Sequence, residues 1–142
     1  MTLENRRSQS DILIFVNKAP IHWYSKQQAT VESSTFGSEF CAMKIAVEMI
    51  ESLRYKLRML GIPIQGPANI FCDNQAVVKN NISVDSTLSK KHSSCAYHFT
   101  RWCVAAGVIS LGWIESKLNL ADAFTKRLPA DVRKKLFGDW TY

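Results

Sequence analysis

Three acidic residues stand where the hydrophobic pattern of the sequence predicts the boundaries of helices and strands. Glu39 lies in the first turn or so of a long helix, Asp73 directly follows a short apolar run, and Asp122 stands near the start of a short C-terminal helix. In open α/β sheets, ligands bind beyond the carboxyl ends of the strands, and Asp73 occupies such a position. Mg²⁺ prefers carboxylate oxygens, and two such ions can clamp the oxygens of a phosphoryl transfer. Together, the acids predict a metal-dependent phosphoryl-transfer site.

Each acid taken singly has a simpler structural explanation. Acidic side chains near a helix N-terminus stabilise the helix dipole, and an aspartate after a strand is a common N-cap. On that interpretation the chain is an unrelated nucleic-acid-binding α/β domain, and the three carboxylates lie far apart. The distances between them in the structure therefore separate the two interpretations.

The apolar periodicity along the chain indicates an α/β domain, because steps of two residues mark strands and steps of three and four mark helices. In chain order we expect strands at 12–16 and 21–25, a third short strand at 29–32, a helix at 35–60, a strand at 69–72, a short helix from 73, a loop at 80–91, a helix at 93–106, a strand at 108–114 and a short helix at 119–126. A hairpin followed by alternating helices and strands implies a mixed sheet flanked by helices. We assign residues 1–10 to a loop or frayed N-terminus, 11–128 to the domain, and 129–142 to a tail that can form one more helix.

The composition favours a polyanionic partner. The 142 residues carry a formal net charge of +6, and such a charge attracts nucleic acid through counterion release at phosphates. A moderately basic soluble protein without such a partner is the open alternative. No apolar run approaches the roughly 18 residues that span a bilayer, and the four cysteines show no zinc-binding spacing. We therefore expect reduced cysteines, an intracellular protein and no membrane partner.

Five segments of the sequence carry more specific motifs. They are RRSQSDILIFVNKAPIHWYSKQQ at 6–28, SSTFGSEF at 33–40, FCDNQAVV at 71–78, KKHSSCAYHFTR at 90–101 and LADAFTKRLP at 120–129. In this order they resemble the ribonuclease H domain of copia-type LTR retrotransposon Pol polyproteins. One such motif is weak evidence, whereas five in register across nearly the whole chain are specific.

The resemblance implies a ribonuclease H-like fold, a mixed sheet flanked by helices, that hydrolyses the RNA strand of RNA–DNA hybrids endonucleolytically with Mg²⁺. Matched residue by residue, Glu39, Asp73 and Asp122 are then catalytic ligands of two Mg²⁺ ions, for which Mn²⁺ can substitute. The implied partners are the RNA–DNA hybrid and the reverse transcriptase domain of the parent polyprotein. The implied location is a cytoplasmic virus-like particle or the nucleus.

A further set of residues matches family positions implied to contact nucleic acid. Its members are Asn74, Lys91, His98 and Arg101. A structural role is an equal alternative for His98 and Arg101, because both lie near Tyr97 on a helix expected to pack against the domain.

The sequence departs from the family pattern at its first element. The resemblance implies a fourth metal-binding acid in a strand upstream of Arg6, where only MTLEN stands, and neither Glu4 nor Asp11 is a convincing substitute. In the family this first strand is central to the sheet. Its absence predicts a gap with unpaired backbone groups, each costing about 1–3 kcal/mol.

Such a gap predicts a chain that is marginally stable unless something fills it, and whose nuclease activity is impaired. Whether this chain is itself an enzyme stays open. The alternative is a non-catalytic remnant or a domesticated nucleic-acid-binding domain that keeps the fold without the chemistry.

Overall fold

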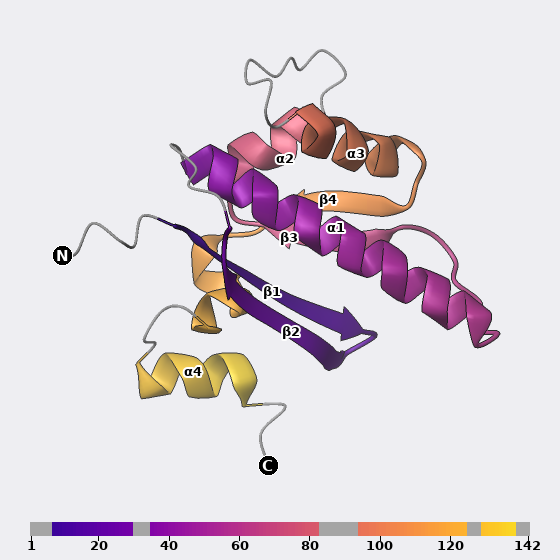
Figure 1. The fold of residues 1–142 in the computed structure, drawn as a ribbon. Helices are drawn as coiled ribbons and strands as arrows, with labels where there is room; N and C mark the ends of the chain where they lie inside the picture. Colours follow the sequence, from indigo (N-terminus) through magenta and orange to yellow (C-terminus); the bar gives the residue numbers. More distant parts are fainter. Residues whose placement is uncertain (1–6, 30–34, 83–93, 125–128, 139–142) are drawn as a thin grey trace.

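The computed structural model describes residues 7–29, 35–82, 94–124 and 129–138, and its helices and strands follow the expected order (Figure 1). The elements are β1 (Gln9–Val16), β2 (Ala19–Gln27), α1 (Thr35–Met59), β3 (Ala68–Cys72), α2 (Gln75–Ile82), α3 (Ser94–Ala105), β4 (Ile109–Trp113), the 3-10 helices η2 (Ser116–Leu118) and η3 (Leu120–Phe124), and α4 (Ala130–Phe137). The expected α/β composition is confirmed. Strand β1 begins at Gln9, inside the stretch 1–10 that the sequence assigns to a loop. Most of the third short strand expected at 29–32 lies outside the described residues.

Strands β1 and β2 form the antiparallel hairpin that the sequence predicts. The turn is tight because Asn17 adopts a left-handed backbone conformation with φ 55°, which asparagine tolerates better than most residues. The register runs from Gln9 opposite Gln27 to Val16 opposite Ala19, with an irregularity between Ile14 and Phe15. Almost all of β2 is exposed to solvent; Tyr24 alone is half-buried in that strand.

Strands β3 and β4 form a parallel pair, as expected for strands that are connected through helices. Ala68 lies opposite Ile109, and Cys72 lies opposite Trp113. Helices α2 and α3 form the crossover between them and lie together on one side of the pair (Figure 1). Because the strands are parallel, their carboxyl ends meet at the same edge.

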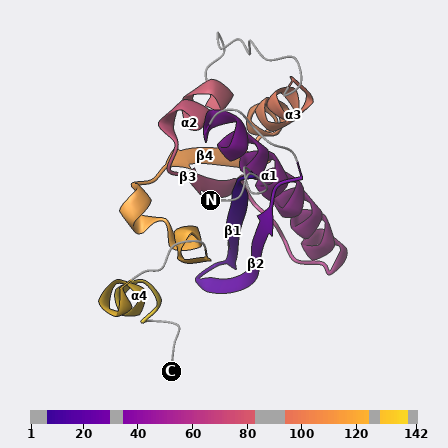
Figure 2. The same cartoon turned by 60° about the vertical axis from the view of Figure 1, so that its left-hand side comes forward.

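The described strands make two separate two-stranded sheets, β1–β2 and β3–β4, so a single continuous mixed sheet is not formed. Each of β1 and β3 is hydrogen-bonded to a neighbouring strand on one side only. The turned view shows the two strand pairs one above the other, with α1 running alongside both (Figure 2). Helix α1 therefore joins the two sheets.

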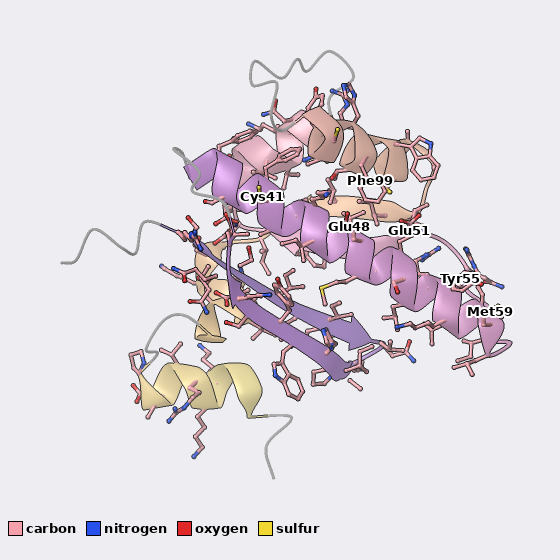
Figure 3. The ribbon with its side chains drawn as sticks, in the orientation of Figure 1. Cys41, Glu48, Glu51, Tyr55, Met59 and Phe99 are labelled. Carbon is pink, nitrogen blue, oxygen red and sulfur yellow. The ribbon has the colours of Figure 1, made fainter. Side chains whose placement is uncertain are left out.

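Helix α1 ends where its sequence predicts. Gly61, with φ +75°, follows the last turn; its amide donates to the Arg58 carbonyl at 2.9 Å, and the Ile62 amide donates to the Leu57 carbonyl at 3.0 Å. These bonds satisfy carbonyls that the helix leaves open, and glycine takes the positive φ without strain. On the outer side of α1, Glu48, Tyr55 and Met59 project away from the sheets (Figure 3).

Two faces of α1 pack into two cores of different size. The larger core is shared by α1, α2, α3, β3 and β4, and consists of Phe40, Met43, Val47, Ile70, Cys72, Val77, Val78, Tyr97, Cys103, Ile109 and Leu111. The smaller core joins α1 to the hairpin through Ile12, Ile14 and Ala46. The apolar stripe that the sequence predicts on this helix is thereby confirmed.

A cavity of about 820 Å³ lies between the two sheets. Residues 11–17, in β1 and the turn after it, and residues 67–73, in and around β3, line it without interruption, so both strands turn an edge toward it rather than one face. One face of α1, including Ala46, Ile50 and Leu53, also lines it. The cavity thus occupies the place where the two strand pairs fail to meet.

Candidate metal centre

Asp73 is placed by the end of β3. The strand buries Ile70 and Cys72 against the larger core, and the chain bends at Asp73 before α2 begins at Gln75. Asn74 caps that helix, because its side-chain oxygen accepts hydrogen bonds from the amides of Ala76 at 3.0 Å and Val77 at 3.3 Å. The cap is therefore Asn74, which leaves the Asp73 side chain available for another role.

Glu39 lies in the second turn of α1 and is half-buried between the buried residues Ser38 and Phe40. The start of this helix is tied to the hairpin by Gln28, whose buried side-chain amide donates to the Ser10 hydroxyl at 2.9 Å and to the Ser38 carbonyl at 2.7 Å. Buried polar groups that are bonded in this way fix the geometry of the elements they join. The hairpin thus helps to set the position of the Glu39 backbone.

Glu39, Cys72 and Asp73 converge at the carboxyl end of β3. One ligand atom from each residue, an oxygen or the thiol sulfur, lies within 4.8 Å of the others. Glu39 and Asp73 also line the cavity between the sheets. Two carboxylates from different elements, brought together beside an open volume, form a donor set that suits a hard divalent cation.

The thiol of Cys72 is a poor match for such a cation. Burial raises the pKa of this thiol to about 11, and the nearby Glu39 and Asp73 charges act in the same direction, while a hydrogen bond from the Asn74 amide opposes them. The protonated thiol is a weak ligand, and Mg²⁺ prefers oxygen. The carboxylates of Glu39 and Asp73 are therefore the ligand groups that suit Mg²⁺.

Asp122 does not belong to this group of ligand atoms within the described part of the chain. It is half-buried in η3, where its amide donates to the Asn119 carbonyl at 3.2 Å. The residues just before it, 118–121, line the same cavity. The structure thus brings two of the three expected acids together and leaves the third on a neighbouring segment.

Asp11 also lines the cavity, and one of its carboxylate oxygens accepts a hydrogen bond from the Ser25 hydroxyl at 2.7 Å. It does not join the ligand group of Glu39, Cys72 and Asp73 among the described residues. Ser25 in turn accepts a hydrogen bond from the side-chain amide of Gln9 at 2.5 Å. Asp11 is thus part of a polar row across the hairpin.

The residues expected to contact nucleic acid lie in different settings. Arg101 is half-buried and stacks over the buried Tyr97 ring, 4.9 Å from its centroid, while its guanidinium donates to the Tyr97 hydroxyl. His98 is exposed and meets the same ring edge-on, with 5.3 Å between centroids. The Arg101 contacts are those expected of a structural residue. The side-chain oxygen of Asn74 is engaged in its cap, and Lys91 lies outside the described residues.

Asp73 is also contacted by two residues, Trp113 and Ser116, that the sequence analysis did not single out. The indole N–H of Trp113 donates to the Asp73 carbonyl at 3.1 Å, and the Ser116 hydroxyl donates to Asp73 Oδ2 at 3.1 Å. Both residues stand at or just after the end of β4. The parallel pairing of β3 and β4 was the available signal, because it brings the residues that follow both strands to one edge.

In the described part of the chain, no helix is both long and apolar enough to cross a membrane.

Comparison with known proteins relates the chain to Pol polyproteins of plant transposons. It is 27% identical over 121 residues to the retrovirus-related Pol polyprotein from transposon RE2 of Arabidopsis thaliana, a match that covers 85% of this chain and 8% of that protein. It is 30% identical over 140 residues to the corresponding polyprotein from transposon TNT 1-94 of Nicotiana tabacum, covering 96% of this chain and 10% of that protein. The chain thus spans a tenth or less of the length of these relatives. No family model and no solved structure matches it.

The homologues support the Pol polyprotein part of the resemblance found in the sequence. They extend over most of this chain, so the described fold and the Glu39–Asp73 pair belong to the region that is shared with them.

Proposed function

We propose that this chain is a ribonuclease H-type nuclease region of a retrotransposon Pol polyprotein, which hydrolyses the RNA strand of RNA–DNA hybrids with Mg²⁺. The observation that carries the proposal is the convergence of Glu39 and Asp73 within 4.8 Å at the carboxyl end of a parallel strand. The net charge of +6 supports a polyanionic substrate. The similarity to retrovirus-related Pol polyproteins of transposons supports the assignment to a polyprotein region.

In this proposal, Glu39 and Asp73 bind Mg²⁺, and Mn²⁺ can substitute for it. When bound, two such ions supply charge neutralisation at the scissile phosphate and a water of lowered pKa. The protein's own part is to hold the two carboxylates at a fixed separation. Phe40 and Cys72, the chain neighbours of Glu39 and Asp73, are buried in the larger core and so fix the backbone at both acids. Asp122, on η3 beside the cavity that residues 118–121 line, is the third proposed ligand.

The substrate lies across the same edge of the sheet. In this proposal the exposed His98 contacts a substrate phosphate, whereas Arg101 stacks on the Tyr97 ring. The reverse transcriptase domain of a parent polyprotein is the proposed partner that delivers the hybrid, in a cytoplasmic virus-like particle or the nucleus.

A second candidate function is hybrid binding without cleavage. It is favoured by the position of Asp122 outside the Glu39–Asp73 group and by the cavity between β1 and β3, both of which leave the site incomplete. A protein of this kind keeps the net positive charge of +6 but lacks metal-dependent turnover.

Cleavage of a labelled RNA–DNA hybrid with Mg²⁺ tests the proposal. The 142-residue chain is compared with one extended at its N-terminus by a strand-forming segment that carries the fourth acid implied by the family resemblance. We expect cleavage of the RNA strand by the extended chain and little or none by the 142 residues alone. Equal cleavage by both chains would show that no essential acid is missing, and hybrid binding without cleavage by either would favour the second function.

Asp73→Asn in the extended chain identifies the metal-binding acid. We expect it to abolish metal-dependent cleavage, because the variant loses a charged ligand while it keeps its shape. The matched control is Asp131→Asn, the same change at an exposed acid of α4, which should leave turnover unchanged. Unchanged turnover in Asp73→Asn would refute the assigned role.

A further inference from the structure

The segment that follows β4 closes over the end of β3. The Ile114 amide donates to the Cys72 carbonyl at 3.0 Å, the Trp113 indole donates to the Asp73 carbonyl at 3.1 Å, and the Ser116 hydroxyl donates to Asp73 Oδ2 at 3.1 Å. The first two bonds hold the backbone of Cys72 and Asp73. Of these three bonds, only the one from Ser116 reaches the Asp73 carboxylate.

Asp73 needs such a contact because it lies beyond the last paired residues of the sheet, Cys72 and Trp113. A carboxylate at that point has freedom about its side-chain torsions that the ladder does not remove. The contact from the Ser116 hydroxyl to the charged oxygen is 3.1 Å, longer than a typical charge-assisted O–H···O bond, and it favours the Asp73 rotamer in which it is made. The observed rotamer is the one that brings Asp73 within 4.8 Å of Glu39.

Ser116 has little to do with the stability of the fold. It is exposed, and it begins the short helix η2, so its hydroxyl is not part of either core. Exposed polar substitutions of this kind usually change the free energy of unfolding by no more than about 0.5 kcal/mol. The effect of its bond is therefore concentrated on the Asp73 side chain.

We propose that Ser116 is a positioning residue that orients the Asp73 carboxylate for divalent-cation binding. This proposal rests on the proposed function for its metal, but it concerns a residue that the resemblance does not mark. Groups that hydrogen-bond to metal ligands typically contribute 10–100-fold to metal affinity, because they fix the ligand before the ion arrives.

The test uses Mn²⁺ as the probe and the 142-residue chain as it stands, with free Mn²⁺ measured by electron paramagnetic resonance. We expect Ser116→Ala to weaken Mn²⁺ binding by roughly 10–100-fold, and Ser116→Thr, which keeps the hydroxyl, to restore it. The matched control is Ser110→Ala, at an exposed serine of β4 that lies opposite Asn69, which should bind Mn²⁺ as the parent does. The melting temperatures of all three variants should stay close to that of the parent.

A second measurement separates this proposal from the proposed function. Three-bond couplings report whether the Asp73 side chain keeps one χ1 rotamer, and this readout needs no metal. We expect a single rotamer in the parent and in Ser116→Thr, and averaging in Ser116→Ala. If the parent binds no Mn²⁺ while the rotamer behaves as expected, the metal function fails and the positioning role stands. A fixed rotamer in Ser116→Ala, or Mn²⁺ affinity equal to that of the parent, would overturn the positioning role.

Discussion

The half of the molecule built on β3 and β4 is held together much more strongly than the half built on the hairpin β1–β2. In the first half, β3 and β4 pack with α1, α2 and α3 around one core of large side chains, which includes Phe40, Val47 and Ile109. The hairpin is tied to α1 by a much smaller cluster, and almost every residue of β2 is exposed. The candidate metal ligands Glu39 and Asp73 both lie on the well-packed half. Their geometry is set mainly by that half, and the hairpin side adds the hydrogen bond from Gln28 to the Ser38 carbonyl.

The cavity of about 820 Å³ is the boundary between the two halves. An edge of β1 and an edge of β3 both line it, and each of these strands is paired with a strand on its other side. Exposed strand edges carry backbone groups ready to pair with another strand. The difference between the halves is thus a difference in pairing as well as in core size.

The largest expected effect comes from filling this cavity with a strand. The chain extended at its N-terminus by a strand-forming segment should gain about 5 kcal/mol in free energy of unfolding, since several backbone groups of β1 and β3, worth about 1–3 kcal/mol each, find partners. Urea denaturation measures the gain, and hydrogen exchange should slow at amides of β1 and β3.

The control for that extension is the same segment with its central residues replaced by proline, which cannot donate to a ladder. It should give no gain. Equal stability of the extended and parent chains would mean that the two halves are not separated by a missing pairing, and the comparison drawn above would fail.

Local patterns of the sequence predict most of the elements but not how the strands associate. The three- and four-residue steps in 35–60 predict α1, and the run before Asp73 predicts β3, because both signals depend on neighbours within a few residues. The separation into two sheets could not be predicted in this way, since strand pairing joins residues that are far apart in the chain. The family resemblance supplied the expectation of a gap.

The candidate site was predicted in the same uneven way. Glu39 and Asp73 are brought together as expected, because each stands at a fixed position relative to the start or end of a well-marked element. Asp122 lies on a segment of 3-10 turns whose course periodicity does not determine, and it stays outside the group among the described residues. Ser116 was missed because a lone serine in a polar stretch carries no local signal of its bond to Asp73.

The next largest effect tests whether the two cores differ in energy as they do in size. Phe40 is 1% exposed and lies between the rings of Phe36 and Tyr97, with centroids 5.7 and 6.1 Å away. Phe40→Ala should cost about 3–5 kcal/mol, and Ile14→Ala in the hairpin core about 2 kcal/mol, the lower end for such a change, because the site borders the cavity. Chemical denaturation measures both values.

Ile82→Ala, at a residue of α2 that is 51% exposed, is the control and should change stability very little. If Ile14→Ala costs as much as Phe40→Ala, the hairpin is as firmly held as the rest of the molecule. The contrast between the halves would then be one of exposure alone.

The smallest predicted effect is a loss of stability at high pH that arises at the site itself. Burial raises the pKa of the Cys72 thiol from 9.0 to about 11 in the folded chain. The folded state therefore keeps the thiol proton more tightly than the unfolded state does. The resulting stabilisation is fully present below pH 9 and is lost as the pH rises through 11, to a limit of about 2–3 kcal/mol.

The measurement is the difference in free energy of unfolding by urea between the parent and Cys72→Ala, taken at pH 8 and above pH 9. Lysines and tyrosines titrate in both chains, so their contributions cancel in this difference. We expect the parent to lose more stability than Cys72→Ala as the pH rises, and Cys95→Ala, at an exposed cysteine of α3, to follow the parent. Parallel curves for the parent and Cys72→Ala would mean that water reaches the thiol beneath Glu39 and Asp73. In that event the end of β3 is as open as the hairpin, and the core would no longer explain how the two carboxylates are held together.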